Sequence, residues 1–236
     1  MPNFANRSYK KELMDDLTLH SDALKQNLIE LRVINRFLGG NLVLVKALNR
    51  LKKQGFFKKE KIYTIADIGS GGGDNLIALA KWFKKNNIQA QLTGIDANDF
   101  MIEFAKSHCK DYTNIDFMKL NVFDTSMENQ TFDITTCSLF CHHFTNEELT
   151  TIFYQIKKIT NNYFIINDLH RHPLAYYSIW LLVHLFNGSY LVKNDAPLSV
   201  LRAFKKQELK ALIAPIWKEN RITWIWAFRW MCLMKV

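Results

Sequence analysis

Residues 67–73 read DIGSGGG and join a β-rich run, Ile62–Ile68, to a run typical of a helix, Asn75–Lys85. Glycine lets the backbone turn sharply, and it lets a ligand approach with no Cβ atom in the way. A phosphate-binding P-loop needs Lys followed by Ser or Thr after its glycines, and no such pair follows here. The dinucleotide fingerprint needs Gly or Ala where this chain has Asp74, whose carboxylate would repel a pyrophosphate. Taken alone, the glycines either turn the chain or hold a ligand other than NAD or a nucleoside triphosphate.

Outward from this loop, short apolar runs alternate with amphipathic runs along the chain. The expected strands are Ile62–Ile68, Gln91–Ile95, Ile115–Lys119, Phe132–Cys137 and Tyr163–Asn167, and the expected helices between them are Asn75–Lys85, Asp99–Lys110 and Glu147–Ile159. This alternation indicates βαβ units, so the predicted fold class is α/β with a doubly wound, mostly parallel sheet. A further helix is predicted at Lys205–Ala214, and the β character of Ile222–Val236 predicts a terminal hairpin.

Composition excludes several classes of protein. The chain has 236 residues, of which 48% are hydrophobic and 22% charged, so intrinsic disorder is excluded. Its four cysteines are scattered with no CxxC pair, which indicates neither a zinc knuckle nor a disulfide framework. No apolar run reaches the length of a membrane span, and residues 1–16 are too polar for a signal peptide. We therefore expect a reduced, cytoplasmic protein.

Four short motifs follow the predicted strands in a fixed order. Asp67 stands two residues before the GxGxG loop, Gly94-Ile-Asp96 ends the second strand, Asn121-Val122 follows the third, and Phe132-Asp133 opens the fourth. In this order the motifs resemble those of class I S-adenosylmethionine (SAM) methyltransferases. The run CSLFCHHF at 137–144 is similar to the small-molecule enzymes that methylate quinones and polyketides.

The resemblance implies a Rossmann-like sheet of seven strands, with the terminal hairpin supplying an antiparallel strand. It divides the chain into an N-terminal helical cap (1–60) and a SAM-binding methyltransferase domain (61–236), with a helical insert at about 172–200 after the fifth strand. In the family, the glycine loop wraps the methionine part of SAM, the residue at Asp96 binds the ribose hydroxyls, and Asn121-Val122 lie at the adenine. The SAM-binding residues implied are Asp67, Gly69, Ser70, Gly71, Gly73, Asp96, Ala97, Met101, Asn121, Val122 and Ser138.

Histidines follow the fourth and fifth strands, at the sheet edge where ligands of open α/β sheets bind. His142, His143 and His170 are the candidate catalytic residues, because histidine titrates near neutrality and suits a general base. One of the first two could instead cap the helix near Thr145 or pack against the cofactor. Adjacent histidines on a loop are weak evidence for a metal, even with Asp168, His170 or His172 as further ligands, so no metal site is predicted.

The residues after the fifth strand are candidates for binding the acceptor. Arg171 either holds an anionic acceptor or pairs with Asp168 to fix the loop. The apolar helix expected at Leu174–Phe186 places Tyr177, Trp180 and His184 on one stripe, which forms either the roof of an acceptor pocket or plain core.

The leading hypothesis is a SAM-dependent methyltransferase acting on a small hydrophobic acceptor, aromatic or polyketide-like, with oxygen as the methylated atom. Carbon methylation of a quinone-like ring is the close variant. The net charge of +9 and the Lys-rich segment 52–61 favour, as the alternative, an RNA or protein methyltransferase. Against that alternative, the amine-methylating motif [DN]PPY is missing after the fourth strand. The aromatic insert and the basic charge also suggest peripheral contact with a membrane.

Overall fold

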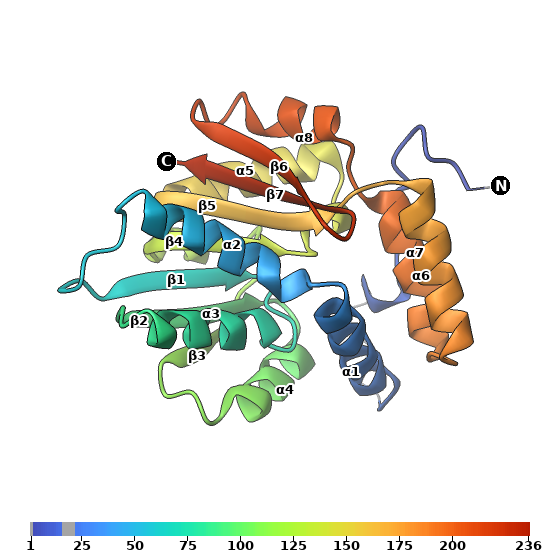
Figure 1. Cartoon of the computed structure of the whole chain (residues 1–236), viewed down its shortest axis with the longest axis horizontal. Coiled ribbons are helices and arrows are strands. Elements are labelled where there is room, and N and C mark those ends of the chain that lie inside the picture. Colours follow the sequence, from blue (N-terminus) through green and yellow to red (C-terminus); the bar gives the residue numbers. More distant parts are fainter. Residues whose placement is uncertain (1, 16–21) are drawn as a thin grey trace.

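A single sheet organises the molecule, and seven strands form it in the order β3-β2-β1-β4-β5-β7-β6 (Figure 1). The computed structural model describes residues 2–15 and 22–236. The strands are β1 (Tyr63–Ile68), β2 (Ala90–Asp96), β3 (Ile115–Lys119), β4 (Phe132–Ser138), β5 (Thr160–Leu169), β6 (Asn220–Ile225) and β7 (Arg229–Lys235). β1 to β5 pair in parallel, and β7 runs antiparallel to both β5 and β6. The predicted doubly wound sheet with an antiparallel strand from the terminal hairpin is confirmed.

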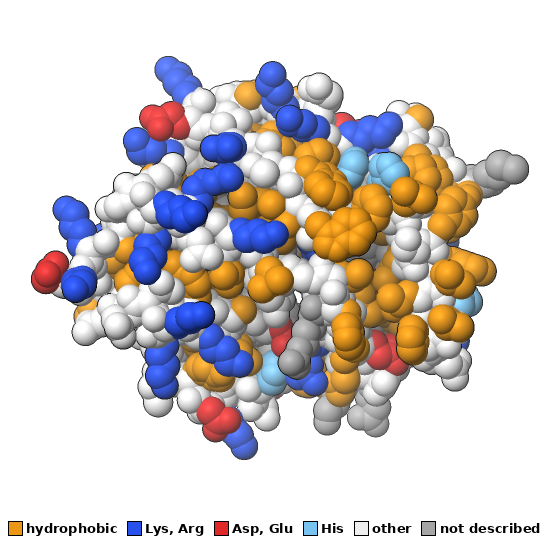
Figure 2. Space-filling view, viewed as in Figure 1, with side chains coloured by type: hydrophobic (Ala, Val, Ile, Leu, Met, Phe, Trp, Pro, Cys, Tyr) orange, Lys and Arg blue, Asp and Glu red, His pale blue; other side chains and the backbone are white. Residues whose placement is uncertain are grey.

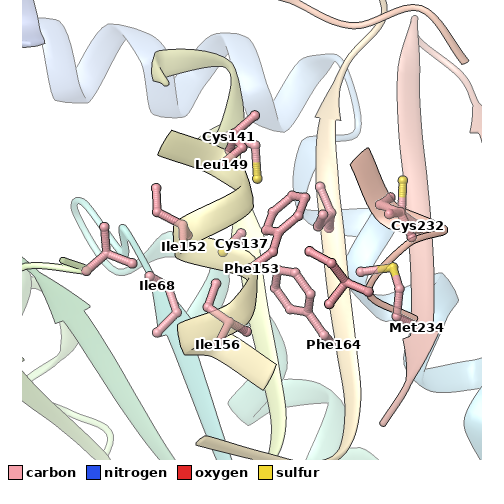
Figure 3. Close-up of a cluster of buried hydrophobic side chains, with 14 of the residues drawn as sticks. Ile68, Cys137, Cys141, Leu149, Ile152, Phe153, Ile156, Phe164, Cys232 and Met234 are labelled. Atoms are coloured by element: carbon pink, nitrogen blue, oxygen red, sulfur yellow. The ribbon is translucent and has the colours of Figure 1, made fainter. Parts of the chain in front are cut away.

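Helices cover both faces of this sheet (Figure 1). One face carries α2 (Gly40–Lys53), α3 (Asp74–Lys85) and α4 (Asp99–Cys109), and the other carries α5 (Asn146–Ile159) and α8 (Lys206–Ile213). Figure 3 shows how α5 packs: Leu149, Ile152, Phe153 and Ile156 point from one stripe toward the strands. This spacing follows the helical period, so one face of α5 is fully apolar. Thr145 begins α5 with a capping box shared with Glu148, and therefore neither histidine caps this helix.

A third group of helices lies beyond the carboxyl ends of the strands. It consists of α1 (Asp22–Phe37), α6 (Pro173–Leu185) and α7 (Tyr190–Arg202), which bury a separate apolar cluster around Ile179, Val183 and Val192. Within the insert, the sequence analysis predicted only α6 as a helix. The structure adds α7, which contains Pro197, a residue that usually interrupts helices. Short 3₁₀ helices occur at η1 (Leu13–Asp15), η2 (Thr125–Asn129) and η3 (Cys141–His143).

The predicted N-terminal cap divides between two places in the structure. α2 shares its core with β1 and α3, through Val43, Leu44, Ala47, Leu48 and Leu51, so it belongs to the packed sheet layer. α1 instead packs near α7, beside the carboxyl edge of the sheet. Residues 1 and 16–21 of the expected cap lie outside the described residues. The boundary at residue 60 stays a prediction.

Candidate active site

A chamber of about 340 Å³ opens at the carboxyl edge of the sheet. Its floor is the glycine loop with the ends of β4 and β5, and its walls are α1, α6, α7 and the turn between β6 and β7. Apolar side chains line most of it: Leu28, Leu31, Ile34, Leu38, Ile179, Leu182 and Val200. Glu12, His142 and His143 lie together in one part of the lining, which we call the polar end, and further polar residues such as Asn75 and Arg229 line other parts. The chamber is therefore a mostly apolar site with a small number of polar groups, the usual design for a small organic ligand.

The glycine loop has a shape that only glycine permits at one point. Gly69 has φ +68°, and a Cβ atom there would lie 2.1 Å from the ring of Phe140. The amides of Gly69 and Ser70 both donate to the Ile95 carbonyl, at 2.8 and 3.1 Å, which pins the loop to the end of β2. Because nothing lies within 4 Å of the Cβ position of Gly71, the backbone there faces open space. The loop is thus a cradle with an open upper side.

Two acidic residues support this cradle. Asp67 is fully buried beneath it; its Oδ1 accepts a 2.6 Å hydrogen bond from Thr136, and the nearby side chain of Asn75 also favours its ionised form. Burial raises the pKa of Asp67 to about 7. Asp96 accepts from the amide of Gly71 through Oδ2 and from that of Asn98 through Oδ1, both at 3.0 Å. Burial also raises the pKa of Asp96, against the opposing effect of these amide donors.

Unpartnered polar atoms on the chamber floor show that the site suits a polar cofactor. Ser70 Oγ and Asn167 Oδ1 are buried, line the chamber and have no hydrogen-bond partner among the residues that the structure describes. A buried group of this kind costs free energy unless a ligand pairs with it. Gly69, Ser70, Gly71 and Ser138 line the chamber, Asp67 and Asp96 brace the loop, and Gly73 begins α3. These residues fit the methionine end of SAM.

Besides Asp67, Gly73 and Asp96, which support the glycine loop without lining the chamber, four more of the SAM-binding residues expected from the family lie outside it. Ala97 and Met101 follow β2, with Met101 buried on α4. Asn121 is exposed after β3, and its side chain accepts from the amide of Phe123, while Val122 is packed in the core. Their role in holding the nucleoside remains a prediction.

His142 is fixed by a buried carboxylate. Its Nδ1 lies 2.7 Å from Asp168 Oδ1, and both side chains are almost fully buried. Asp168 also accepts from the amides of His142 and Leu169, which holds the carboxylate in place. The pKa of Asp168 is lowered, because the neighbouring His142 outweighs the effect of burial. With Nδ1 bonded to the carboxylate, Nε2 is the ring nitrogen that His142 presents to the chamber.

His143 is held by a second carboxylate, which comes from the N-terminal segment. Its Nδ1 lies 2.5 Å from Asp15 Oδ1, and Arg202 Nη1 binds the other oxygen of Asp15 at 2.6 Å. Burial opposes ionisation of Asp15, but His143 and Arg202 together hold its pKa well below the usual range. Arg202 Nε also donates to the carbonyl of His142 at 3.1 Å. The guanidinium group of Arg202, on α7, therefore joins this helix to His142 of η3 and to residues 10–15.

Glu12 is a site residue that the sequence analysis missed. It is 3% exposed and lines the polar end of the chamber, and burial raises its pKa to about 7. No sequence motif marks Glu12, because it lies in a polar segment far from the histidines in sequence. Only the fold brings them together: Asp195 of α7 accepts from the amides of Leu13 and Met14 and anchors this segment.

The remaining candidates take different positions. His170 lines the chamber near the β6–β7 turn, and burial lowers its pKa. Arg171 is buried and pairs with Glu208, rather than with Asp168, while also donating to the carbonyls of Phe4 and Ala5. Tyr177 and Trp180 are exposed on the outer side of α6, and the ring of His184 stacks on Trp180 there. The inner side of α6 presents Ala175, Ser178, Ile179 and Leu182 to the chamber instead.

Comparison with known proteins agrees with this geometry. Residues 65–162 match the family model described as a methyltransferase domain. No curated protein sequence matches the chain. Among solved structures, the plantazolicin methyltransferase BpumL in complex with SAH has a TM-score of 0.69, at 17% identity over 91% of each chain.

Two further solved structures are similar. Magnesium protoporphyrin IX methyltransferase (ChlM) from Synechocystis PCC 6803 with bound SAH has a TM-score of 0.55 at 15% identity, over 84% of this chain and 83% of that chain. The CurJ carbon methyltransferase has a TM-score of 0.60 at 12% identity, over 83% of this chain and 53% of that chain. At such identities the likeness is one of fold, and that fold is the class I methyltransferase fold. With a matching methyltransferase domain and a fitting glycine loop, the protein is a SAM-dependent methyltransferase, and SAM is its cofactor.

Proposed function

We propose that the protein transfers the methyl group of SAM to an oxygen atom of a small hydrophobic acceptor, aromatic or polyketide-like. The observation that carries this proposal is the chamber itself, because mostly apolar walls from α1, α6 and α7 enclose a space that borders both the glycine loop and the cluster of Glu12, His142 and His143. The similar structures include magnesium protoporphyrin IX methyltransferase and the CMeT domain of the citrinin polyketide synthase, and these names support a small organic acceptor. The proposal concerns the acceptor, since the cofactor follows from the domain.

The chain's own residues have three tasks in this reaction, and SAM when bound supplies the electrophilic methyl group. The glycine loop and Asp96 position the cofactor. The apolar walls hold the acceptor and exclude water, which brings the reacting atoms to near-attack distance. Neutral hydroxyl oxygen is a poor nucleophile, so it must be activated, and we assign this task to the polar end. His142 is central there because Asp168 fixes its orientation.

The test is calorimetric titration with SAM and with NAD, followed by transfer assays with hydrophobic phenols and alkyl-substituted enols. We expect micromolar or tighter binding of SAM alone and products that carry O-methyl groups by NMR. His142→Gln is expected to lower the transfer rate by roughly 100-fold or more, because activation of the acceptor hydroxyl is lost, with SAM affinity unchanged. Methylation of carbon, or of RNA in preference to every small acceptor, would contradict the proposal.

A further inference from the structure

Three side chains that offer metal-ligating atoms meet at the polar end of the chamber. Glu12 comes from the N-terminal segment, and His142 and His143 come from η3 after β4. Within the described part of the chain, their ligand-capable atoms all lie within 4.8 Å of one another. All three residues line the chamber, so an ion held by them would border the space of the acceptor.

Glu12 is a buried carboxylate with few partners. It is 3% exposed, and among the described residues neither of its oxygens has a partner with full hydrogen-bond geometry, although the hydroxyl of Ser199 acts to lower its pKa. The cationic groups of His142 Nε2 and Arg202 Nε are both 3.7 Å from Oε1, beyond hydrogen-bond distance. A buried carboxylate with so few hydrogen bonds is costly, and such groups are usually paired or bound to a metal. A cation beside Glu12 would supply the partner that the described residues do not.

Both histidines are oriented as metal ligands are. The Nδ1 of His142 is bonded to Asp168 and the Nδ1 of His143 to Asp15. Histidines that bind metals almost always pass their other ring N–H to a carboxylate or a carbonyl, which fixes the tautomer and raises the basicity of the ligand nitrogen. The nitrogen left to each ring is Nε2, and that of His142 faces Glu12. A single histidine that acts as a base needs only one orienting carboxylate. Here both His142 and His143 are oriented in this way, as two metal ligands would be.

We propose that Glu12, His142 and His143 bind a divalent transition-metal ion, with Zn²⁺ as the best match, and that an open coordination position faces the acceptor oxygen. Two imidazole nitrogens and one carboxylate oxygen suit Zn²⁺, while Mg²⁺ prefers oxygen ligands. In a tetrahedral site with bonds of ~2.1 Å, ligand atoms are roughly 3.4 Å apart. The His142–Glu12 pair at 3.7 Å is close to this separation, and the other ligand atoms, which lie within 4.8 Å of one another, have to move inward when the ion binds. The role given to the ion in catalysis rests on the proposed function.

The chemistry is Lewis-acid activation of the acceptor hydroxyl. The ion lowers the pKa of the hydroxyl group, and the proton leaves to solvent. The oxygen then forms a bond to the methyl carbon of SAM, and the C–S bond breaks with its electron pair on sulfur, which yields the thioether product. His142 and His143 act in this reaction as ligands rather than as proton acceptors.

The test measures metal binding by the full chain without SAM or acceptor. Protein stripped with a chelator is titrated with Zn²⁺ in competition with a chromogenic chelator, and we expect one ion per chain. Glu12→Gln and His142→Gln should each weaken binding at least 10-fold, and Asp168→Asn should weaken it about 10- to 100-fold through the orientation of His142. The matched controls are Glu147→Gln, on the exposed start of α5, and His184→Gln, outside the chamber, which should bind Zn²⁺ as the unaltered protein does.

Each result decides the question. Affinity for SAM and the thermal melting curve report whether each variant is folded, and Glu12→Gln introduces almost no change in shape. If the unaltered protein binds Zn²⁺ no more tightly than Glu12→Gln does, or binds Mg²⁺ equally well, the inference is wrong. If Zn²⁺ binds as expected but no O-methylated product forms, the metal site stands and the proposed function fails. If chelator-treated enzyme transfers methyl groups at the full rate and Zn²⁺ does not bind, His142 is the base and the metal inference fails.

Discussion

Asp67 illustrates how a single buried residue makes stability depend on pH. Its folded-state pKa of about 7 lies above the ordinary value of 3.8, so its contribution to stability is present below pH 4 and is lost as pH rises toward 7. Asparagine does not ionise, so Asp67→Asn removes this loss of stability. For the shift in pKa from 3.8 to about 7, the loss is at most roughly 4 kcal/mol. We expect the free energy of unfolding to fall less between pH 5 and pH 8 in the variant, as measured by urea denaturation. Glu12 titrates in the same window, so part of the fall remains. Equal slopes for both proteins would contradict this account.

Asp96 allows a test of cofactor binding at the same scale. Asp96→Ala removes the acceptor of the Gly71 amide and, by the family resemblance, a charged partner of the ribose hydroxyls. A hydrogen bond to a charged group contributes roughly 1.5–3 kcal/mol, so SAM affinity should fall about 10- to 100-fold in calorimetry. Asp116→Ala is the matched control, because Asp116 is an exposed carboxylate on the neighbouring strand β3. Unchanged affinity in the Asp96 variant would mean that the residue has another role.

Some residues of the site could be predicted from the sequence, and others could not. Asp67, the glycines and Asp96 stand at fixed positions relative to strand ends, so local spacing predicted them. Glu12 and Asp15 have no such local signal, because their partners are His142 and His143, more than a hundred residues later. The structure places the predicted histidine pair on the chamber lining, where its catalytic role stays a prediction, and the carboxylates around it could be found only from the tertiary structure.

At the scale of the element, the glycine loop depends on the close approach of Phe140. Gly69→Ala places a Cβ atom against that ring, whereas Gly55→Ala has a similar φ of +74° with nothing within 4 Å. We expect Gly55→Ala to cost only the ~1–2 kcal/mol of a left-handed backbone, and Gly69→Ala to cost more and to abolish SAM binding. Urea unfolding and calorimetry measure both effects.

The double variant Gly69→Ala, Phe140→Ala separates the two contributions. It relieves the clash and should recover part of the stability lost in Gly69→Ala. Equal stability of the Gly55 and Gly69 variants would show that the ring approach does not matter.

Helices show where patterns along the chain succeed and fail. The apolar residues of α5 recur with the helical period, and a capping box marks where the helix begins. The bounds of α5 were therefore predicted almost to the residue. In α7, Pro197 and the polar run Lys193-Asn194-Asp195 argue against a helix, yet Asp195 is buried because it binds the N-terminal segment. Similarly, the stripe of α6 that contains Trp180 was expected to form either the roof of a pocket or plain core, and in the structure it is exposed while smaller residues of α6 line the chamber.

Over the whole molecule, apolar and basic side chains occupy different regions of the visible surface. Figure 2 shows Lys and Arg concentrated over α2 and its neighbours, and apolar side chains concentrated near α6 and the β6–β7 turn. Leu174, Leu181 and Leu185 of α6 are more than half exposed. None of the described helices combines the length and the apolar character needed to cross a membrane.

Contact with a membrane surface therefore remains a prediction that depends on the α6 face. We expect the protein to float with vesicles containing anionic lipid, because both exposed apolar area and basic charge favour such binding. The double variant Leu181→Ser, Leu185→Ser should reduce flotation several-fold, while Tyr154→Ser, on an exposed part of α5, should not. Association of the α6 face with a second copy would appear as a dimer in sedimentation without flotation.

The N-terminal segment also determines the order in which the molecule is completed. Phe4 and Ala5 are bound by Arg171, Leu13 and Met14 by Asp195, and Asp15 by Arg202. During synthesis on the ribosome this segment emerges first, and Asp195 follows Leu13 by 182 residues. A nascent chain that ends before α7 already contains the five parallel strands and Arg171, but it lacks Asp195 and Arg202. Residues 13–15, which include the carboxylate partner of His143, are thus docked only after α7 has been made, and the polar end of the site is completed late in synthesis.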